Sequence, residues 1–432
     1  MEYNRPVSKS FRKALLYALL GVFLVLGTGT ILYAQGYRFD FATMRVKKVG
    51  AIYIQSHPKD ADIFLDGEKR EESRGILSSG VLVQSLFPKT YKVELELEGY
   101  ENWRRTVSVE PSLVTELNPI LLPEKRDIFS EKDAQNIYTF QDGSVVLKIG
   151  GKIYAGETLI PGTNVVDQSA DNNELLTSDS KGNFYLIKLS AGIKPSAQKL
   201  ASAKSYILDT GSNQLISYST AQVSLLEAGK VPTKIFTSTK SQIVEAVSPA
   251  SGLIAWAVYD AKYATSTIFT YERLLGRVSQ IDVSLPGKTY KMQLSSRNIL
   301  GLLQDNAELY FYDLLSGTLE KKSENVRQFS FSPSGAWTAI LGEKTLEIYS
   351  KDGDYVRLNL SAYPYINSVS WYRDERHLLL NLGSGVGLLD FSAVDPENIQ
   401  HLANSTNAAY DTEGNILYYV LDGKVWSLTI PK

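Results

Sequence analysis

The feature that most restricts the fold of this chain is a repeat of apolar segments that starts after Pro123 and continues to the C-terminus. In each copy an apolar run, a turn-forming polar pair and a second apolar run follow one another. These pairs lie about 39 residues apart on average, close to the roughly 40 residues of one four-stranded β-propeller blade. The pairs are Asp142-Gly143, Asp171-Asn172, Gly211-Ser212, Ser251-Gly252, Arg297-Asn298, Ser334-Gly335, Arg373-Asp374 and Glu413-Gly414. Residues 127–432 are therefore predicted to form a β-propeller.

Two copies contain a recognisable turn motif. Phe331–Gly335 has the sequence FSPSG, and Val247–Gly252 has the sequence VSPASG. Both resemble the Phe-Ser-Pro-Asp-Gly turn of TolB-like and WD-type β-propeller repeats, with Ser334 in place of the usual Asp. The resemblance implies a ring of four-stranded sheets, a scaffold that hosts many unrelated functions.

The ends of the repeat indicate how the ring closes. Eight copies predict an eight-bladed propeller, with seven blades as the alternative if the second or fifth copy is not a full blade. The last copy, Ala408 to Ile430, has three apolar runs and lacks a fourth. Asp127–Phe129, just before the first copy, can supply the missing strand. Pairing the two ends in this way removes the free sheet edges that invite aggregation.

Residues 50–122 show a second β pattern. A YKVELEL segment from Tyr91 to Leu97 alternates apolar and charged side chains, as in a strand with one buried face. Asp66-Gly67, directly after the predicted strand Asp62–Leu65, is typical of a hairpin turn. Five or six such strands predict a small β-sandwich.

This segment resembles the PEGA domain, a small β-sandwich of surface-layer and other envelope proteins. The matching pieces are SHPKDADIFLDG (Ser56–Gly67), LFPKTYKVELELEGY (Leu86–Tyr100) and TVSV (Thr106–Val109). Asp60 and Lys89 stand where the family usually has Gly. The family is not enzymatic, so the resemblance implies a spacer, here a stalk.

The stretch from Ala14 to Tyr37 contains no charged residue. As a helix its 24 residues would extend about 36 Å, enough to cross a hydrocarbon core of about 30 Å. A cleavable signal peptide would have a shorter apolar region and a small-x-small site, whereas Leu32 precedes Ala34 by two positions. Residues 14–37 are therefore predicted to be a transmembrane helix.

Four basic residues lie on each side of this segment, so the positive-inside rule does not decide its orientation. The short segment 1–13 is predicted to be a cytoplasmic tail. The predicted location is the cell membrane, with a single pass, a cytoplasmic N-terminus and a large extracytoplasmic C-terminal region.

Composition excludes several classes of function. Lys and Arg number 45 against 47 Asp and Glu, so the net charge of −2 provides no general field for nucleic acid. The absence of Cys excludes disulfides, thiolate metal sites and cysteine nucleophiles. We predict no nucleic-acid partner and no cofactor.

No catalytic or metal-binding constellation is found. His57, His377 and His401 lie far apart in the sequence and are interpreted as isolated histidines. The acidic groups Asp171, Glu174 and Asp179, and Asp352 and Asp354, lack the spacing of a calcium loop. Four tryptophans on predicted strands are interpreted as core between blades, namely Trp256, Trp337, Trp371 and Trp426.

The fourth copy is unusually long, with about 46 residues to the next turn. Extra length in a blade is expected in loops at one face, and exposed Tyr and Arg are favoured contact residues. The predicted partner-binding patch comprises Tyr259, Tyr263, Tyr271, Arg273 and Arg277. Tyr363-Pro364-Tyr365 is a second candidate loop.

The sequence predicts a membrane-anchored, non-catalytic envelope protein whose propeller binds a protein, peptide or glycan, with the PEGA-like domain as stalk. One alternative is a lactonase- or lyase-like enzyme with a metal in the central funnel, which requires at least three converging carboxylate or imidazole groups. A purely structural envelope component is the third hypothesis.

Overall fold

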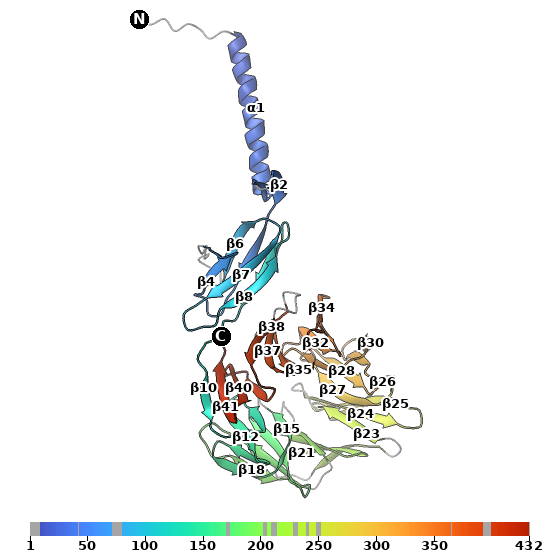
Figure 1. Ribbon diagram of the computed structural model, residues 1–432. Coiled ribbons are helices and arrows are strands. Elements are labelled where there is room, and N and C mark those ends of the chain that lie inside the picture. The colour runs from blue at the N-terminus through green and yellow to red at the C-terminus, as the bar shows by residue number, and fades with distance from the viewer. Residues whose placement is uncertain are drawn as a thin grey trace. The chain divides into compact units, whose positions relative to one another are not determined.

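The computed structural model describes residues 9–41, 43–70, 80–169, 173–201, 205–208, 214–227, 232–238, 242–247, 252–363, 365–391 and 399–431. The chain divides into two compact units. One comprises Met1–Leu122 with Pro431–Lys432, and the other comprises Pro123–Ile430. Figure 1 shows the elements of both, and each unit is described by itself.

The described residues contain one helix that is long and apolar enough to cross a bilayer, α1 (Lys9–Ala34). It starts five residues before the predicted span and ends three residues before the predicted end. Gly36 follows with φ +85°, a left-handed conformation that commonly ends helices, and its N–H donates to the Tyr33 carbonyl. The prediction of helix as far as Tyr37 was wrong, because Tyr37 begins a strand.

That strand belongs to a hairpin that the sequence analysis did not predict. β1 (Tyr37–Asp40) pairs antiparallel with β2 (Arg45–Lys48), in a two-stranded sheet of its own. The hairpin directly follows the helix.

The rest of the first unit is a sandwich of two sheets, in agreement with the predicted fold. One sheet has the order β6-β3-β9 and contains β3 (Gly50–Ile54), β6 (Val81–Leu86) and β9 (Val114–Leu117). The other has the order β5-β4-β7-β8 and contains β4 (Asp62–Leu65), β5 (Glu68–Lys69), β7 (Thr90–Glu96) and β8 (Trp103–Ser108). The predicted alternation is confirmed, since Tyr91, Val93 and Leu95 are buried in the shared core.

The hairpin turn at Asp66-Gly67 is also confirmed, with φ of 52° and 83°. Lys89, at a position where the family usually has Gly, supports this turn. Its Nζ lies 2.6 Å from Asp66 Oδ2 and 4.4 Å from the centre of the Tyr91 ring. The hydrogen bonds from Lys89 and from the Lys92 N–H hold the pKa of Asp66 below its ordinary value.

The second unit contains eight four-stranded sheets in its described part, so the eight-bladed prediction is confirmed over the seven-bladed one. The first sheet contains β11 (Asn136–Thr139), β12 (Val145–Ile149), β13 (Lys152–Ala155) and β14 (Thr158–Ile160). The second sheet contains β15 (Asn164–Ser169), β16 (Glu174–Ser178), β17 (Phe184–Lys188) and β18 (Ser196–Lys199). The third sheet contains β19 (Ser205–Leu208), β20 (Gln214–Tyr218), β21 (Gln222–Glu227) and β22 (Thr233–Thr237). The fourth sheet contains β23 (Gln242–Val247), β24 (Leu253–Asp260), β25 (Thr265–Glu272) and β26 (Arg277–Pro286).

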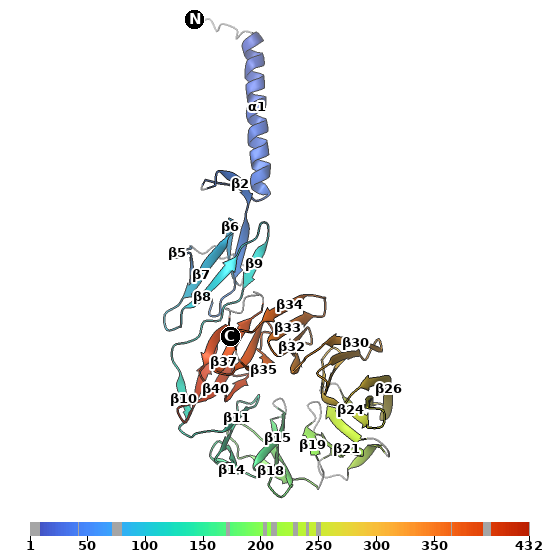
Figure 2. The ribbon, with the colours of Figure 1, turned by 45° about the vertical axis from the view of Figure 1, so that its right-hand side comes forward.

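The remaining sheets complete a ring, and Figure 2 shows the sheets following one another around it. The fifth sheet contains β27 (Thr289–Leu294), β28 (Ile299–Gln304), β29 (Leu309–Asp313) and β30 (Thr318–Ser323). The sixth sheet contains β31 (Gln328–Phe331), β32 (Trp337–Leu341), β33 (Thr345–Ser350) and β34 (Tyr355–Asn359). The seventh sheet contains β35 (Ile366–Trp371), β36 (His377–Leu382), β37 (Gly385–Asp390) and β38 (Ile399–Ala403). The eighth sheet contains β10 (Asp127–Ser130), β39 (Ala408–Asp411), β40 (Ile416–Leu421) and β41 (Lys424–Thr429).

The ring closes as predicted. β10, from the start of the unit, pairs with β41 from its end, with Asp127 opposite Ser427 and Ile128 opposite Trp426. The closing sheet then packs on the first sheet, where Val425 and Tyr418 share a core with Ile137 and Leu147. Both ends of the unit are therefore held in one sheet.

The extra length of the fourth copy lies in its strands, which corrects the expectation of an enlarged loop. β24 and β25 have eight residues each and β26 has ten, whereas the other strands of the ring have three to six. The register pairs Leu253 with Glu272 and Asp260 with Thr265. The β24–β25 hairpin is therefore long. At a rise of about 3.3 Å per residue, the pair Leu253–Glu272 lies about 23 Å from the pair Asp260–Thr265.

Candidate functional site

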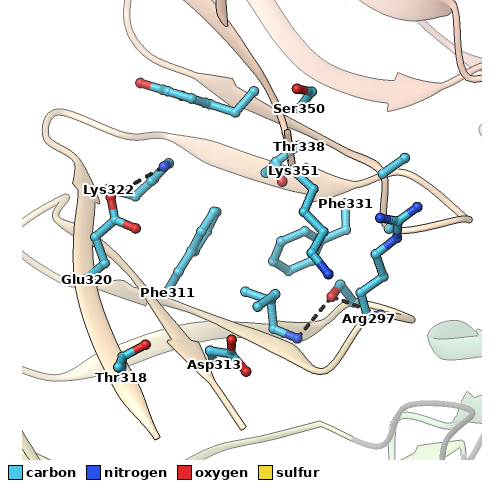
Figure 3. Close-up of a pocket in the computed structure, with 15 residues that line it drawn as sticks. Arg297, Phe311, Asp313, Thr318, Glu320, Lys322, Phe331, Thr338, Ser350 and Lys351 are labelled. Atoms are coloured by element: carbon cyan, nitrogen blue, oxygen red, sulfur yellow. Dashed lines mark hydrogen bonds and ion pairs between the residues drawn. The ribbon is translucent and has the colours of Figure 1, made fainter. Parts of the chain in front are cut away.

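A groove lies between two neighbouring blades, the β27–β30 sheet and the β31–β34 sheet. It has a volume of about 230 Å³. Its walls come from β28–β33 and from the turns between the first two strands of each blade, at residues 295–298 and 332–336, the second of which overlaps the FSPSG motif. Figure 3 shows two phenylalanine rings at its centre and charged side chains around them.

The β30 wall follows from the alternation of side chains along a strand. Thr318, Glu320 and Lys322 are two residues apart and line the groove, as do Phe311 and Asp313 on the paired strand β29. Successive side chains point to opposite faces of a sheet, so the five residues share one face. The T-x-E-x-K pattern of β30 is a signal that the sequence analysis missed.

Two cations line the groove, Arg297 from the turn between β27 and β28 and Lys351 from the end of β33. The Arg297 Nε donates to the Ser334 carbonyl at 3.2 Å, which orients the guanidinium. Lys351 follows β33 and extends toward Phe331 (Figure 3). Within the described part of the chain, neither cation forms a salt bridge with a carboxylate. Arg297 and Lys351 therefore offer donors to an anionic group.

Asp313, whose carboxylate also lines the groove, already accepts hydrogen bonds. Asp313 accepts the N–H groups of Leu315 at 2.8 Å and Ser316 at 3.3 Å in the turn after β29. These bonds, aided by the positive charge of Lys351, lower the pKa of Asp313 below its ordinary value. Asp313 stays ionised and holds the turn.

The opposite side combines a weaker ion pair with aromatic rings. Lys322 lies 3.4 Å from Glu320 and 4.7 Å from the centre of the Tyr349 ring. The rings of Phe311 and Phe331 pack with their centres 5.3 Å apart. The groove thus joins an apolar floor to charged rims, an arrangement that suits a ligand with both an apolar part and an anionic group.

Hydrogen bonds between neighbouring blades fix one end of the groove. The Ser296 hydroxyl donates to the Pro333 carbonyl at 3.0 Å. The Ser334 N–H in turn donates to Glu375 Oε1 at 2.8 Å, and the Ser334 hydroxyl also donates to the Glu375 carboxylate. Ser334, which replaces the usual Asp of the repeat motif, thus joins three successive blades.

The predicted partner-binding residues do not form one patch. Tyr259 and Tyr263 lie at one end of the β24–β25 hairpin, and Tyr271, Arg273 and Arg277 lie at the other. Tyr263 and Arg277 are exposed, whereas Tyr271 packs against the core between blades. An antiparallel pair of eight-residue strands separates the two groups, which spacing along the chain did not indicate.

Two of the most exposed apolar side chains of this blade were not in the prediction. Leu274 and Leu275, in the turn between β25 and β26, are 95% and 65% exposed. Gly276 closes the turn with φ +60°. An L-L-G sequence between two strands and between two arginines was the available signal. Of the second candidate loop, Tyr365 is exposed, and Pro364 lies outside the described residues.

The histidines and carboxylates serve local structure. His57 belongs to the first unit, while His377 is buried and His401 is exposed in one blade of the second. Glu174 pairs with Lys188 at 2.9 Å. Asp179 caps its turn through bonds from the Asn183 side chain and backbone, which lower its pKa to about 2. Asp171 lies outside the described residues, and the described residues contain no group of three or more potential metal ligands.

The tryptophans divide in their packing. Trp256 is fully buried, and Trp337 and Trp371 pack on the core between the β31–β34 and β35–β38 sheets. Trp426 is half-buried and donates its indole N–H to the Leu421 carbonyl at 3.2 Å. The core interpretation is confirmed for the first three.

Asp374 lies in the turn between β35 and β36, and its protonation tests how acid affects this turn. It accepts the N–H groups of Arg376 and His377, and its Oδ2 lies 2.6 Å from His377 Nδ1. Desolvation beside the buried His377 would raise the pKa of Asp374, but these hydrogen bonds outweigh it and lower the pKa below its ordinary value. The ionised form is therefore favoured by folding.

Replacing Asp374 with Asn is expected to lower the free energy of unfolding by about 1 kcal/mol at pH 7. A depressed pKa stabilises the fold above the unfolded pKa of about 4, and this stability is lost as the pH falls through the lower folded pKa. The difference between variant and parent should therefore shrink in urea titrations between pH 5 and pH 3. Replacing the exposed Asp352 with Asn is the control. A difference in unfolding free energy between D374N and the parent that grows as the pH falls would contradict the lowered pKa of Asp374.

Comparison with known domains identifies the sandwich. Residues 49–124 match the model of the PEGA domain. This segment is a PEGA domain. Its boundaries agree with the 50–122 predicted from the sequence. No curated protein matches this chain.

Solved structures similar to the chain include propellers. An oligogalacturonate lyase in complex with manganese is 9% identical, with 71% of this chain and 97% of that chain covered and a TM-score of 0.47. The Pan2 WD40 domain of Neurospora crassa is 11% identical, with 63% and 90% covered and a TM-score of 0.42. The propeller assignment itself stands on the eight sheets and their closure.

Proposed function

We propose that the chain is a single-pass membrane protein that displays a partner-binding propeller outside the cytoplasm, with the PEGA domain as stalk. The helix α1 supports the anchor. Its uncharged part from Ala14 to Ala34 would extend about 32 Å, close to the hydrocarbon thickness of about 30 Å.

The observation that carries the binding role is the groove between the β27–β30 and β31–β34 sheets. Arg297 and Lys351 have no salt-bridge partner among the described residues and stand beside the rings of Phe311 and Phe331. A carboxylate on a peptide or glycan would pair with these cations, while an adjoining apolar group would cover the rings. The proposed partner is therefore an acidic segment of an envelope protein, peptide or glycan.

Crosslinking in native membranes tests this proposal. A photo-crosslinking amino acid is placed at Thr318, which lines the groove, and at the exposed Lys181 in another blade as control. We expect a discrete product from position 318 that position 181 does not give. Digestion of the product with protease or glycosidase then distinguishes a protein partner from a glycan.

Charge reversal provides the quantitative arm. The double variant Arg297→Glu with Lys351→Glu is expected to reduce crosslinking from position 318 at least tenfold, because both proposed ion pairs become repulsive. Lys181→Glu, which changes charge outside the groove, should leave the yield unchanged. Equal crosslinking by the double variant and the parent, with both folded, would refute the groove as the binding site.

A further inference from the structure

The β1–β2 hairpin has two chemically different faces. Because side chains alternate along each strand, opposite residues share a face. One face carries Tyr37 opposite Lys48 and Phe39 opposite Val46, and the other carries Arg38 opposite Lys47 and Asp40 opposite Arg45. The first face is mainly apolar and the second is charged.

The apolar side chains of this hairpin are exposed. Phe41 and Met44, in the turn, are 80% and 71% exposed, and Phe39 and Val46 are exposed as well. The rings of Phe39 and Phe41 pack edge to face, with centres 4.9 Å apart. Neighbouring exposed apolar side chains of this size mark a surface that contacts another molecule or a membrane.

The hairpin is held at the C-terminal end of α1. The Arg38 guanidinium lies 3.5 Å from the centre of the Tyr33 ring and donates to the Tyr33 carbonyl at 2.8 Å. The Val49 N–H donates to the Gly36 carbonyl at 2.9 Å. Only Gln35 and Gly36 separate the helix from β1. The depth of the helix in a membrane would therefore fix the depth of the hairpin.

That depth is set by length. If Ala14–Ala34 fill a hydrocarbon core of about 30 Å, Tyr37 begins just outside it, within a headgroup layer of about 5–7 Å. Aromatic side chains favour this layer, and Arg and Lys there can reach lipid phosphates with their long side chains. Residues 37–48 contain four basic residues and one acid, Asp40, giving +3.

We propose that the hairpin of residues 37–48 lies on the membrane surface, with Phe39, Phe41 and Met44 among the lipid headgroups and its basic side chains on anionic phospholipids. The inference rests on the proposed membrane span of α1. It adds a second membrane contact that fixes how the stalk leaves the bilayer. Lys47 pairs with Asp40 at 2.8 Å, which leaves Arg38, Arg45 and Lys48 as the excess positive charge.

The chain lacks Cys, so single cysteines can report depth in the full-length protein. Spin labels are attached to Leu24→Cys in the middle of α1, Phe41→Cys in the hairpin and Glu98→Cys in an exposed turn of the PEGA domain. The protein is placed in nanodiscs that contain phosphatidylglycerol, and collisions with oxygen and with a water-soluble nickel chelate are measured. We expect nickel accessibility at position 41 to be at least fivefold lower than at 98, with a depth between those of 98 and 24.

The outcomes separate the two proposals. A water-exposed label at position 24 refutes the membrane span. A label at 24 in the bilayer with the label at 41 as accessible as that at 98 overturns the hairpin contact alone. Disulfide-linked dimers of Phe41→Cys, with that site shielded from both reagents, would assign the surface to a second copy of the chain and overturn the lipid proposal.

Lipid charge provides an independent arm. In nanodiscs of phosphatidylcholine alone, nickel accessibility at position 41 is expected to rise at least twofold relative to the anionic discs. Adding Arg45→Glu and Lys48→Glu should remove this difference, whereas Lys181→Glu in the propeller should preserve it. Accessibility that does not respond to lipid charge in the parent would overturn the role of anionic phospholipid.

Discussion

Replacing Trp256 with alanine is expected to destabilise the propeller by about 3–5 kcal/mol, the usual cost of removing a large buried aromatic side chain. Trp256 is fully buried between the β19–β22 and β23–β26 sheets, in a core that includes Ile216 and Val223. Its ring is stacked on Phe269 at 6.0 Å and lies 5.1 Å from Phe236. The cavity would open at the contact between two blades. Urea denaturation of the detergent-solubilised protein measures the effect.

Trp256→Phe is the matched control. The indole Nε1 of Trp256 is buried and finds no hydrogen-bond partner among the described residues. Phenylalanine keeps most of the apolar contact and removes this unpaired N–H, whose burial is unfavourable. We expect W256F to cost less than about 1.5 kcal/mol. Equal losses for W256F and W256A would show that the indole N–H has a role that this packing does not explain.

Replacing Asp127–Ser130 with Gly-Ser-Gly-Ser is expected to open the ring. Most side chains of β10 are exposed, so the strand contributes mainly through its backbone pairing with β41. Glycine and serine keep the backbone donors but disfavour an ordered strand, so the segment is expected to leave β41. Losing about three net hydrogen bonds costs about 3 kcal/mol, and the freed edge of β41 invites aggregation. Urea denaturation and size-exclusion chromatography of the detergent-solubilised protein measure the two effects.

Ile128→Thr is the control for this replacement. It changes an exposed side chain but keeps a β-branched residue that favours a strand, so pairing with Trp426 should persist and stability should change by less than about 0.5 kcal/mol. If the Gly-Ser variant remained as stable and as monodisperse as I128T, closure by β10 would not stabilise the propeller. That result would attribute closure to the core around Val425 instead.

Local sequence signals predicted much of the fold. Alternation from Tyr91 to Leu97 and the Asp66-Gly67 turn located the sandwich, and the missing fourth strand of the last copy pointed to Asp127–Phe129. These features succeed because strand alternation and turn conformation depend on residues that are neighbours in the chain. The β1–β2 hairpin was missed because Tyr37 continues the uncharged run and conceals the end of the helix at Ala34.

The candidate sites were predicted less well. Tyr263 and Arg273 were placed together because they are close in sequence, yet the long β24–β25 hairpin puts them at opposite ends. The groove brings together Arg297, Asp313, Glu320 and Lys351, which come from two different blades. The sequence pattern of either blade alone does not indicate this meeting.

The sequence by itself determined the eightfold repeat, the pairing that closes the ring, the PEGA domain and the apolar helix, since each is written in periodicity or in a local motif. Only the tertiary structure decided which charged side chains form no salt bridge among the described residues and which tyrosines are buried. Such properties depend on how one sheet packs against the next. That packing is governed by contacts between residues many positions apart, so a single sequence carries no periodic signal for it.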